Sequence, residues 1–240
     1  MRNLIAILVL FAAAALSPQA SAARRTKDLA PPPPGATLPV LINHTLKAQH
    51  LHAGQAITVQ LLQTVPVSSQ VDLPAGTKLD GHVVNVSASS LSILFDRLRW
   101  KDRTLPVRVR LIAAAGFMDV YRAKLPLGAT DRSITNPGDW TTAQIGGDEV
   151  YLSGGSGKVY DCYSKPVGFA DFSGVYASPS SPDQLPRAMG PFSTTASGLY
   201  GFSKLSIASA GGANAPITLA ASKPRWRISN GSAFLLEVVR

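Results

Sequence analysis

The sequence is poor in cysteine and in long apolar runs, and it lacks the common catalytic motifs. Cys162 is its single cysteine, which excludes an intrachain disulfide, so packing has to stabilise the fold. Beyond residues 4–16, no segment is apolar over the about 20 residues that a transmembrane helix needs. The nucleophile motif G-x-S-x-G is also absent. Because no catalytic constellation is found, we expect a protein that is not an enzyme.

Histidine is scarce as well, and the sequence holds four such residues. His50 and His52 project to one face if their segment is extended, and His44 lies shortly before them. A metal site usually needs three or four ligands, and neither the nearby carboxylates nor Cys162 has a recognisable spacing to this pair. We therefore expect no metal site and no other cofactor, with the histidines exposed to solvent at a turn.

The first 22 residues have the pattern of a cleavable signal peptide. Arg2 supplies a positive charge, residues 4–16 are apolar, and Ala20 and Ala22 are the small residues of a cleavage site. Residues 23–37 form a basic, proline-rich spacer in which four consecutive prolines favour an extended chain. We expect export to the periplasm or the exterior of a bacterial cell, with no transmembrane segment after cleavage.

The chain is basic. Without residues 1–22 it keeps 22 basic and 14 acidic residues, a formal net charge of +8. Such a balance favours anionic partners such as acidic glycans, lipid headgroups or nucleic acid. Because nucleic acid is the less accessible partner after export, we expect either an envelope protein or an anionic polymer as the partner, and no nucleic acid.

Residues 72–115 predict a β meander around which the rest of the chain is organised. Apolar residues alternate with polar ones before and after the turn at Lys101-Asp102-Arg103, which is the period-two pattern of strands with one buried face. Residues 38–46 and 56–65 have the composition of two earlier strands. The closing segment 233–239 is apolar, and we expect it to pair with the early part of the domain.

The predicted fold class is all-β. We expect one β-barrel, or a barrel-like sandwich, over residues 38–240, and 45% hydrophobic residues suffice for its core. An irregular insertion spans about residues 116–197, where glycine pairs separate short valine and tyrosine segments and predict irregular hairpins and long loops. Within the insertion, the pattern leaves open whether residues 118–122 form a short helix or a strand.

The most suggestive surface feature is a cluster of cations on and around the predicted hairpin. Because like charges on neighbouring strands repel one another, such clustering favours an anionic partner. The alternative is an ordinary solvated outer face, partly neutralised by Asp96 and Asp102. The candidate residues are Arg97, Arg99, Lys101, Arg103, Arg108 and Arg110.

Two segments resemble a known family. The turn and strand around Pro74, Gly76, Thr77, Leu79 and Gly81, and the closing glycine turn and strand at residues 229–238, are similar to the C-terminal β-barrel domain of VirB10/TrbI-type components of bacterial type IV secretion and conjugation machines. The chain is also similar to secreted acidobacterial proteins of no known activity that share this domain. The resemblance implies a barrel in which these five residues form the fold, and it implies no catalytic role.

Composition, motifs and resemblance together favour an exported, non-enzymatic structural or interaction domain of the bacterial cell envelope. The alternative is a binding module that recognises an anionic envelope polymer or glycan through the basic hairpin face. A hydrolase is a distant third hypothesis, because no base or nucleophile motif supports it.

Overall fold

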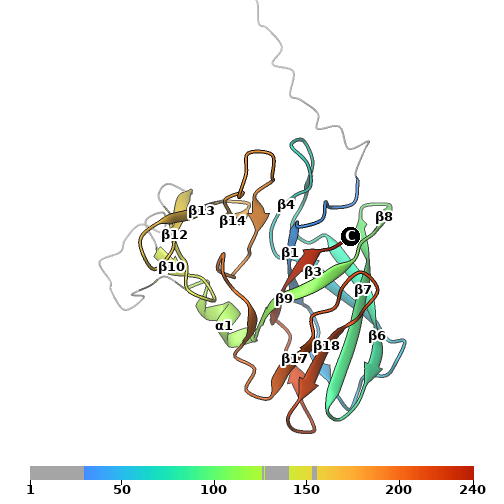
Figure 1. The fold of residues 1–240 in the computed structure, drawn as a ribbon. Helices are drawn as coiled ribbons and strands as arrows, with labels where there is room; N and C mark the ends of the chain where they lie inside the picture. Colours follow the sequence, from blue (N-terminus) through green and yellow to red (C-terminus); the bar gives the residue numbers. More distant parts are fainter. Residues whose placement is uncertain (1–29, 126, 128–140, 153–155) are drawn as a thin grey trace, which may run out of the picture.

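The computed structural model describes residues 30–125, 127, 141–152 and 156–240. The expected signal peptide and the basic start of the spacer lie outside these residues. Figure 1 shows two β-layers side by side, a larger barrel-like layer and a smaller sheet, with the single helix of the described chain between them. Within the described chain, no helix has both the length and the apolar character needed to cross a membrane.

The larger layer is a nearly closed barrel, which confirms the predicted all-β, barrel-like fold. The described residues place in it β1 (Thr37–Ile42), β3 (Ala56–Leu61), β6 (Lys78–Val86), β7 (Ser90–Trp100), β8 (Arg103–Pro106), β9 (Val109–Ala115), β16 (Gly198–Tyr200), β17 (Leu205–Ser209), β18 (Ile217–Ala221) and β20 (Ala233–Val238). The strand order is β16-β9-β20-β1-β3-β6-β7-β18-β17, with β8 paired to β7. The barrel nearly closes beside β9, where the Leu111 amide donates at 2.7 Å to the carbonyl of Ala210, the residue after β17.

The predicted meander holds from β6 to β8 but not beyond. β6, β7 and β8 are consecutive antiparallel neighbours, and the chain reverses at Lys101-Asp102 as expected. The prediction that the meander continues through residue 115 is wrong. The last contact of the hairpin is the Val107 amide, which donates to the Asp96 carbonyl at 3.0 Å, and the chain then changes neighbours so that β9 pairs with β20 and β16.

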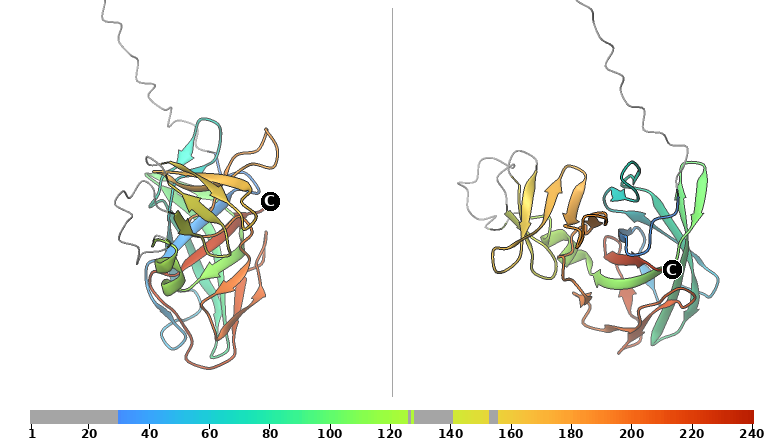
Figure 2. Two further views of the ribbon diagram at one scale, coloured as in Figure 1. Left: turned by 90° about the vertical axis from the view of Figure 1, so that its left-hand side faces the viewer. Right: turned by 45° about the horizontal axis from the view of Figure 1, so that its top comes forward.

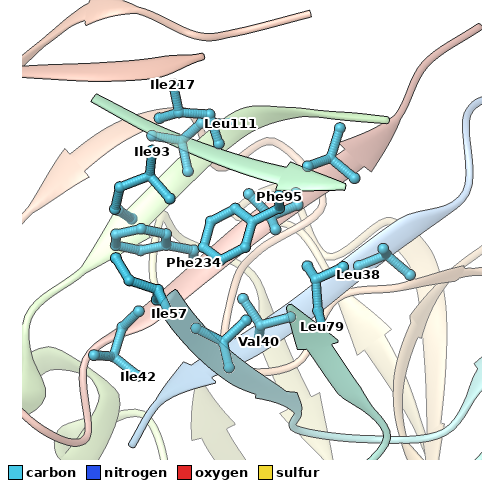
Figure 3. Close-up of a cluster of buried hydrophobic side chains, with 14 of the residues drawn as sticks. Leu38, Val40, Ile42, Ile57, Leu79, Ile93, Phe95, Leu111, Ile217 and Phe234 are labelled. Atoms are coloured by element: carbon cyan, nitrogen blue, oxygen red, sulfur yellow. The ribbon is translucent and has the colours of Figure 1, made fainter. Parts of the chain in front are cut away.

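The last strand, β20, lies between β1 and β9 and is antiparallel to both, which confirms the predicted pairing of the C-terminus with the early part of the domain. It is buried on both faces. Phe234, Leu236 and Val238 face the barrel core, and Ala233 and Leu235 face a second core outside the barrel. Figure 3 shows Phe234 among labelled side chains of β1, β3, β7 and β9. Strand β20 is therefore the shared wall of the two layers.

The smaller layer is more regular than the sequence suggests. Within the described residues it consists of six antiparallel strands in chain order: β10 (Thr141–Ala143), β11 (Glu149–Tyr151), β12 (Gly157–Tyr160), β13 (Pro166–Asp171), β14 (Gly174–Ala177) and β15 (Arg187–Ala188). The predicted hairpins are present, but they join into one sheet (Figure 2). The strands have two to six residues, which is too short for a clear period-two pattern.

The segment that the sequence left open is a helix, α1 (Phe117–Arg122). It begins directly after β9, where the Gly116 amide donates to the Tyr200 carbonyl at 2.9 Å. Val120 is its buried residue and packs into the second core. The helix therefore lies between the two layers at the end of the barrel wall.

Two small two-stranded ladders complete the described β-structure. The strand β2 (Leu46–Lys47) pairs with β19 (Arg227–Ile228), and β4 (Val65–Pro66) pairs with β5 (Asp72–Leu73). At the N-terminal end, Pro34 and Gly35 form a turn, and the Gly35 amide donates to the Val238 carbonyl at 2.8 Å. The end of the expected spacer is thus part of the fold and is not a free tether.

A buried glutamine joins the barrel to the smaller sheet. The Gln63 side chain donates from Nε2 to the Val175 carbonyl at 2.8 Å, and its Oε1 accepts from the amides of Val175 and Gly190 at 3.1 and 2.7 Å. Tyr176 adds a second link, because its hydroxyl donates to the Thr64 carbonyl at 3.0 Å. Burial raises the pKa of the Tyr176 hydroxyl, which keeps it protonated as a donor. This polar residue just after β3 therefore connects the layers.

The residues of the family-like motif lie in the turn before β6 and in β6 itself. The Thr77 hydroxyl donates to the Pro74 carbonyl at 2.7 Å, and Gly76 has a φ of +81°, which favours glycine. Leu79 is fully buried in the barrel core. A Cβ on Gly81 would lie 2.9 Å from the Cα of Phe95, so glycine lets β6 and β7 approach at a bulge.

We expect Phe234→Ala to lower the free energy of unfolding by about 3–5 kcal/mol, because it leaves a cavity in the wall shared by the layers. The matched control is Phe172→Ala, which removes an equal side chain that is 93% exposed and should change stability by less than about 0.5 kcal/mol. Urea unfolding followed by circular dichroism measures both. Equal effects for the two variants would contradict the central position of β20.

A second stability prediction concerns Gly81. The Cβ of Gly81→Ala would press on the backbone and ring of Phe95, so we expect a loss of about 1–3 kcal/mol. Gly212→Ala is the control, since a Cβ at that position would have no atom within 4 Å and the backbone there does not require glycine. Thermal melts of the two variants should differ clearly, and a Gly81→Ala protein as stable as the parent would rule out the close approach.

The amide clamp formed by Gln63 gives a third prediction. Gln63→Leu leaves the half-buried amides of Val175 and Gly190 without their acceptor, whereas the Val175 carbonyl keeps the Met189 amide as a donor at 2.8 Å. Each unpaired group costs about 1–3 kcal/mol when it is buried. We expect a loss of at least about 2 kcal/mol, measured by urea unfolding. Gln60→Leu, in β3, is the control, because no hydrogen bond of its side chain is found within the described residues. Similar losses for both variants would argue against the clamp.

Candidate anion-binding cleft

The structure divides the predicted basic face between two places. Arg97, Arg99, Lys101 and Arg103 lie on the β7–β8 hairpin, whereas Arg108 and Arg110 lie beyond the point where the chain leaves it. Most of these cations have polar partners. Arg97 pairs with Asp96 at 3.2 Å, and Arg99 pairs with Asp80 at 3.1 Å. Arg108 donates to the Ala213 carbonyl at 2.9 Å and to the Asn214 side chain, and Arg110 donates to Glu237 at 2.6 Å. On the hairpin itself, the carboxylates of Asp96 and Asp80 reduce the positive potential that Arg97 and Arg99 present.

A shallow cleft of about 420 Å³ lies at the tip of the hairpin. Pro74, Gly76 and Thr77, from the turn of the family-like motif, line this cleft together with Arg99 and Lys101. The sequence did not predict that these two segments lie close together. Lys78 and Trp100 complete its wall, and the Lys101 Nζ lies 4.5 Å from the centroid of the Trp100 ring. We call it the hairpin cleft.

A larger cleft, of about 910 Å³, lies beside the helix, and we call it the α1 cleft. Four segments that are distant in the sequence form it: the start of α1, the turn between β16 and β17, the chain around β19, and the turn before β20. Its lining residues are Gly116, Phe117, Met118, Asp119, Arg122, Gly201, Phe202, Ser203, Lys204, Leu205, Arg225, Trp226, Arg227, Ser229 and Ser232.

The α1 cleft is strongly basic. Its described lining includes four cations, Arg122, Lys204, Arg225 and Arg227, and one carboxylate, Asp119. The Arg122 Nη1 lies 4.0 Å from the Asp119 Oδ1, which is a weak and largely exposed contact. Within the described chain, no ion pair joins the other three cations to a carboxylate. The positive charge of this cleft is therefore less neutralised than that of the hairpin.

Trp226 fixes the two arginines of the α1 cleft. The indole is buried, and its Nε1 donates to the Ser87 carbonyl at 3.3 Å, so the backbone on either side of it is held in place. Arg225 has a φ of +62°, a left-handed conformation that costs a non-glycine residue about 1–2 kcal/mol. Arg227 lies opposite Lys47 in the β2–β19 ladder, where two like charges repel. Strain and repulsion of this kind are often found at ligand sites.

The wall of the α1 cleft contains a buried hydroxyl. Ser232 lines the α1 cleft, its side chain is fully buried, and its Oγ has no hydrogen-bond partner within the described chain. Buried polar atoms almost always have a partner, either in the protein or in water. Within the described residues, the hydroxyl is therefore an unpaired polar atom just behind the wall of the cleft.

The other sequence candidates lie elsewhere. His44, His50 and His52 are exposed, and in the described part of the chain no group of three or more histidine, cysteine or acidic side chains could hold a metal ion. Asp148 and Glu149 are neighbouring acids in the sequence, but Asp148 is buried and accepts from the Thr194 hydroxyl at 2.5 Å, whereas Glu149 is exposed.

Sequence reasoning missed the α1 cleft because its cations come from residues 122, 204 and 225–227, which form no run and no periodic pattern. The one local signal is Arg225-Trp226-Arg227, in which an aromatic residue separates two arginines. That motif indicates an anchored basic segment only when the tryptophan is known to be buried. The turn at Gly201 and the helix were equally undefined before the fold was known.

Comparisons of the chain with protein-family models, with curated proteins and with solved structures found no match. The resemblance to the VirB10/TrbI-type barrel therefore stays a hypothesis that rests on the motif residues. The chemistry of the two clefts has to be argued from their own side chains.

Proposed function

We propose that the protein is an exported, non-enzymatic interaction domain of the bacterial cell envelope, VirB10/TrbI-like in architecture, that binds an anionic envelope component in the α1 cleft. The observation that carries this proposal is the charge of the cleft, with four lining cations and one carboxylate. A concave basic surface attracts anions because the positive potentials of its walls add together.

The arginines suit this role better than a dispersed surface charge does. A guanidinium presents several N–H donors in one plane and matches the geometry of carboxylate, sulfate and phosphate groups. Arg225 and Arg227 flank the buried Trp226, so their backbone positions are fixed before a ligand arrives. Preorganisation of this kind lowers the entropy cost of binding.

The hairpin cleft is the weaker site in this proposal. Arg99, its arginine, already pairs with Asp80, and Lys101 lies over the Trp100 ring. The cations of the α1 cleft form fewer ion pairs within the described chain, so an anionic ligand that binds there has fewer carboxylates to displace. The competing hypothesis, which the sequence suggests, is that an anionic polymer or glycan binds to the basic hairpin face.

The test is binding of dextran sulfate to matched triple variants, measured by isothermal titration calorimetry at two salt concentrations. Lys204→Ala/Arg225→Ala/Arg227→Ala should weaken binding at least about tenfold, equivalent to about 1.4 kcal/mol. It should also flatten the salt dependence, because exposed charges are screened at about 10 Å in 0.1 M salt.

The control variant is Arg97→Ala/Arg99→Ala/Lys101→Ala, which removes the same number of charges from the hairpin. We expect it to weaken binding less than about threefold. The reverse ranking would move the site to the hairpin, and no binding of dextran sulfate by the parent would contradict the proposal as a whole. Uncharged dextran serves as the ligand control.

A further inference from the structure

The rim of the α1 cleft is apolar as well as basic. Phe117, Met118 and Tyr121 are 46%, 51% and 50% exposed on one short helix. The rings of Phe117 and Tyr121 stack with their centroids 6.2 Å apart. Large apolar side chains that gather on a surface indicate an interaction site more often than isolated ones do. A soluble anion alone would leave these side chains in water.

The apolar and basic groups share one site. Phe117 and Met118 line the same cleft as Arg225 and Arg227, and Arg122 follows on the same helix. Aromatic and aliphatic side chains flanked by arginine and lysine are the composition of elements that lie in a membrane interface, with cations at the phosphate level and apolar groups below it. The lining of the cleft is complementary to this two-part surface.

The fold holds these side chains on a fixed platform. A Cβ on Gly231 would lie 2.6 Å from the Phe117 ring, so the ring rests directly on that backbone. The Gly116 amide donates a hydrogen bond to the Tyr200 carbonyl, and Val120 packs into the second core on the other side of α1. The exposed side chains are therefore displayed by a helix that is itself well packed.

We infer that the α1 cleft docks on an anionic lipid surface: Arg225, Arg227 and Lys204 bind the phosphate of a headgroup, and Met118, Phe117 and Tyr121 enter the headgroup layer beside it. This rests on the proposed function, and it names the anionic component as a phosphate-bearing lipid. A soluble anionic polymer and an acidic protein are the competing partners, and the experiment separates them.

The experiment is sedimentation of the chain from residue 23 onward with vesicles of phosphatidylcholine alone or of phosphatidylcholine with phosphatidylglycerol. We expect binding to the anionic vesicles only. Met118→Ser/Tyr121→Ser should weaken it at least about tenfold, since two apolar groups lose their burial. The same variant should bind dextran sulfate within about twofold of the parent.

The matched control is Tyr163→Ser/Phe172→Ser, which removes exposed apolar side chains from the smaller sheet and should not change vesicle binding. Arg225→Ala/Arg227→Ala should weaken binding to both vesicles and dextran sulfate. Phe117 is kept in all variants because its ring packs on Gly231, and circular dichroism melts establish that each variant is folded. A second variant, Met118→Ser alone, keeps the Phe117–Tyr121 stack and should still weaken vesicle binding.

One outcome would overturn the inference of a lipid surface: vesicle binding that is unchanged in Met118→Ser/Tyr121→Ser, together with dextran sulfate binding that still depends on the arginines. The proposed function would then stand, with a soluble polymer as the partner. Soluble glycerol phosphate that displaces the protein from vesicles at low concentration would overturn the inference of a lipid surface in favour of a free phosphate ligand. If Arg225→Ala/Arg227→Ala bound both the vesicles and dextran sulfate as tightly as the parent, the proposed function would be overturned as well.

Discussion

The constraint on which the structure depends is that β20 is buried on both of its faces. Its alternate side chains fill two cores, with Phe234 and Leu236 in the barrel and Leu235 in the layer outside it. Burial of one face already specifies the register of a strand, because a one-residue shift turns its apolar side chains to the other face, and here such a shift would exchange two complete sets of core contacts. The strand therefore fixes β1 and β9 at its edges, and through them it fixes where the smaller sheet and α1 can pack.

The α1 cleft is a consequence of this arrangement. β9 ends at Ala115 and continues directly into α1, whereas the turn through Ser229 and Ser232 leads into β20, so the antiparallel pairing of β9 and β20 brings these two segments to the same end of the barrel wall. The buried Trp226 holds the basic segment before that turn. The cations and apolar side chains of the cleft are positioned by the most deeply packed part of the molecule.

Much of the barrel could be predicted from the sequence, because the strands β6 and β7 show period-two alternation and the apolar C-terminus needs a partner. The path of β9 could not, since the alternation continues through Pro106 and Val107 while the chain changes neighbours. The smaller sheet was missed because its strands are short, and the α1 cleft because its arginines meet only in the folded chain. The hairpin cations and Asp96 were recognised from the sequence, but Asp80, which pairs with Arg99 from the neighbouring strand, was not.

Amide chemical-shift mapping by NMR, during titration of the chain from residue 23 onward with a short dextran sulfate, tests the assignment of the site most directly. We expect the largest shifts on residues 116–122, 201–205 and 225–232, with the amides of residues 97–103 nearly unchanged. We also expect the amides of β20 beyond Ser232 to keep their positions, because that strand is packed on both faces. Shifts concentrated on the hairpin, or spread evenly over the basic surface, would contradict the account.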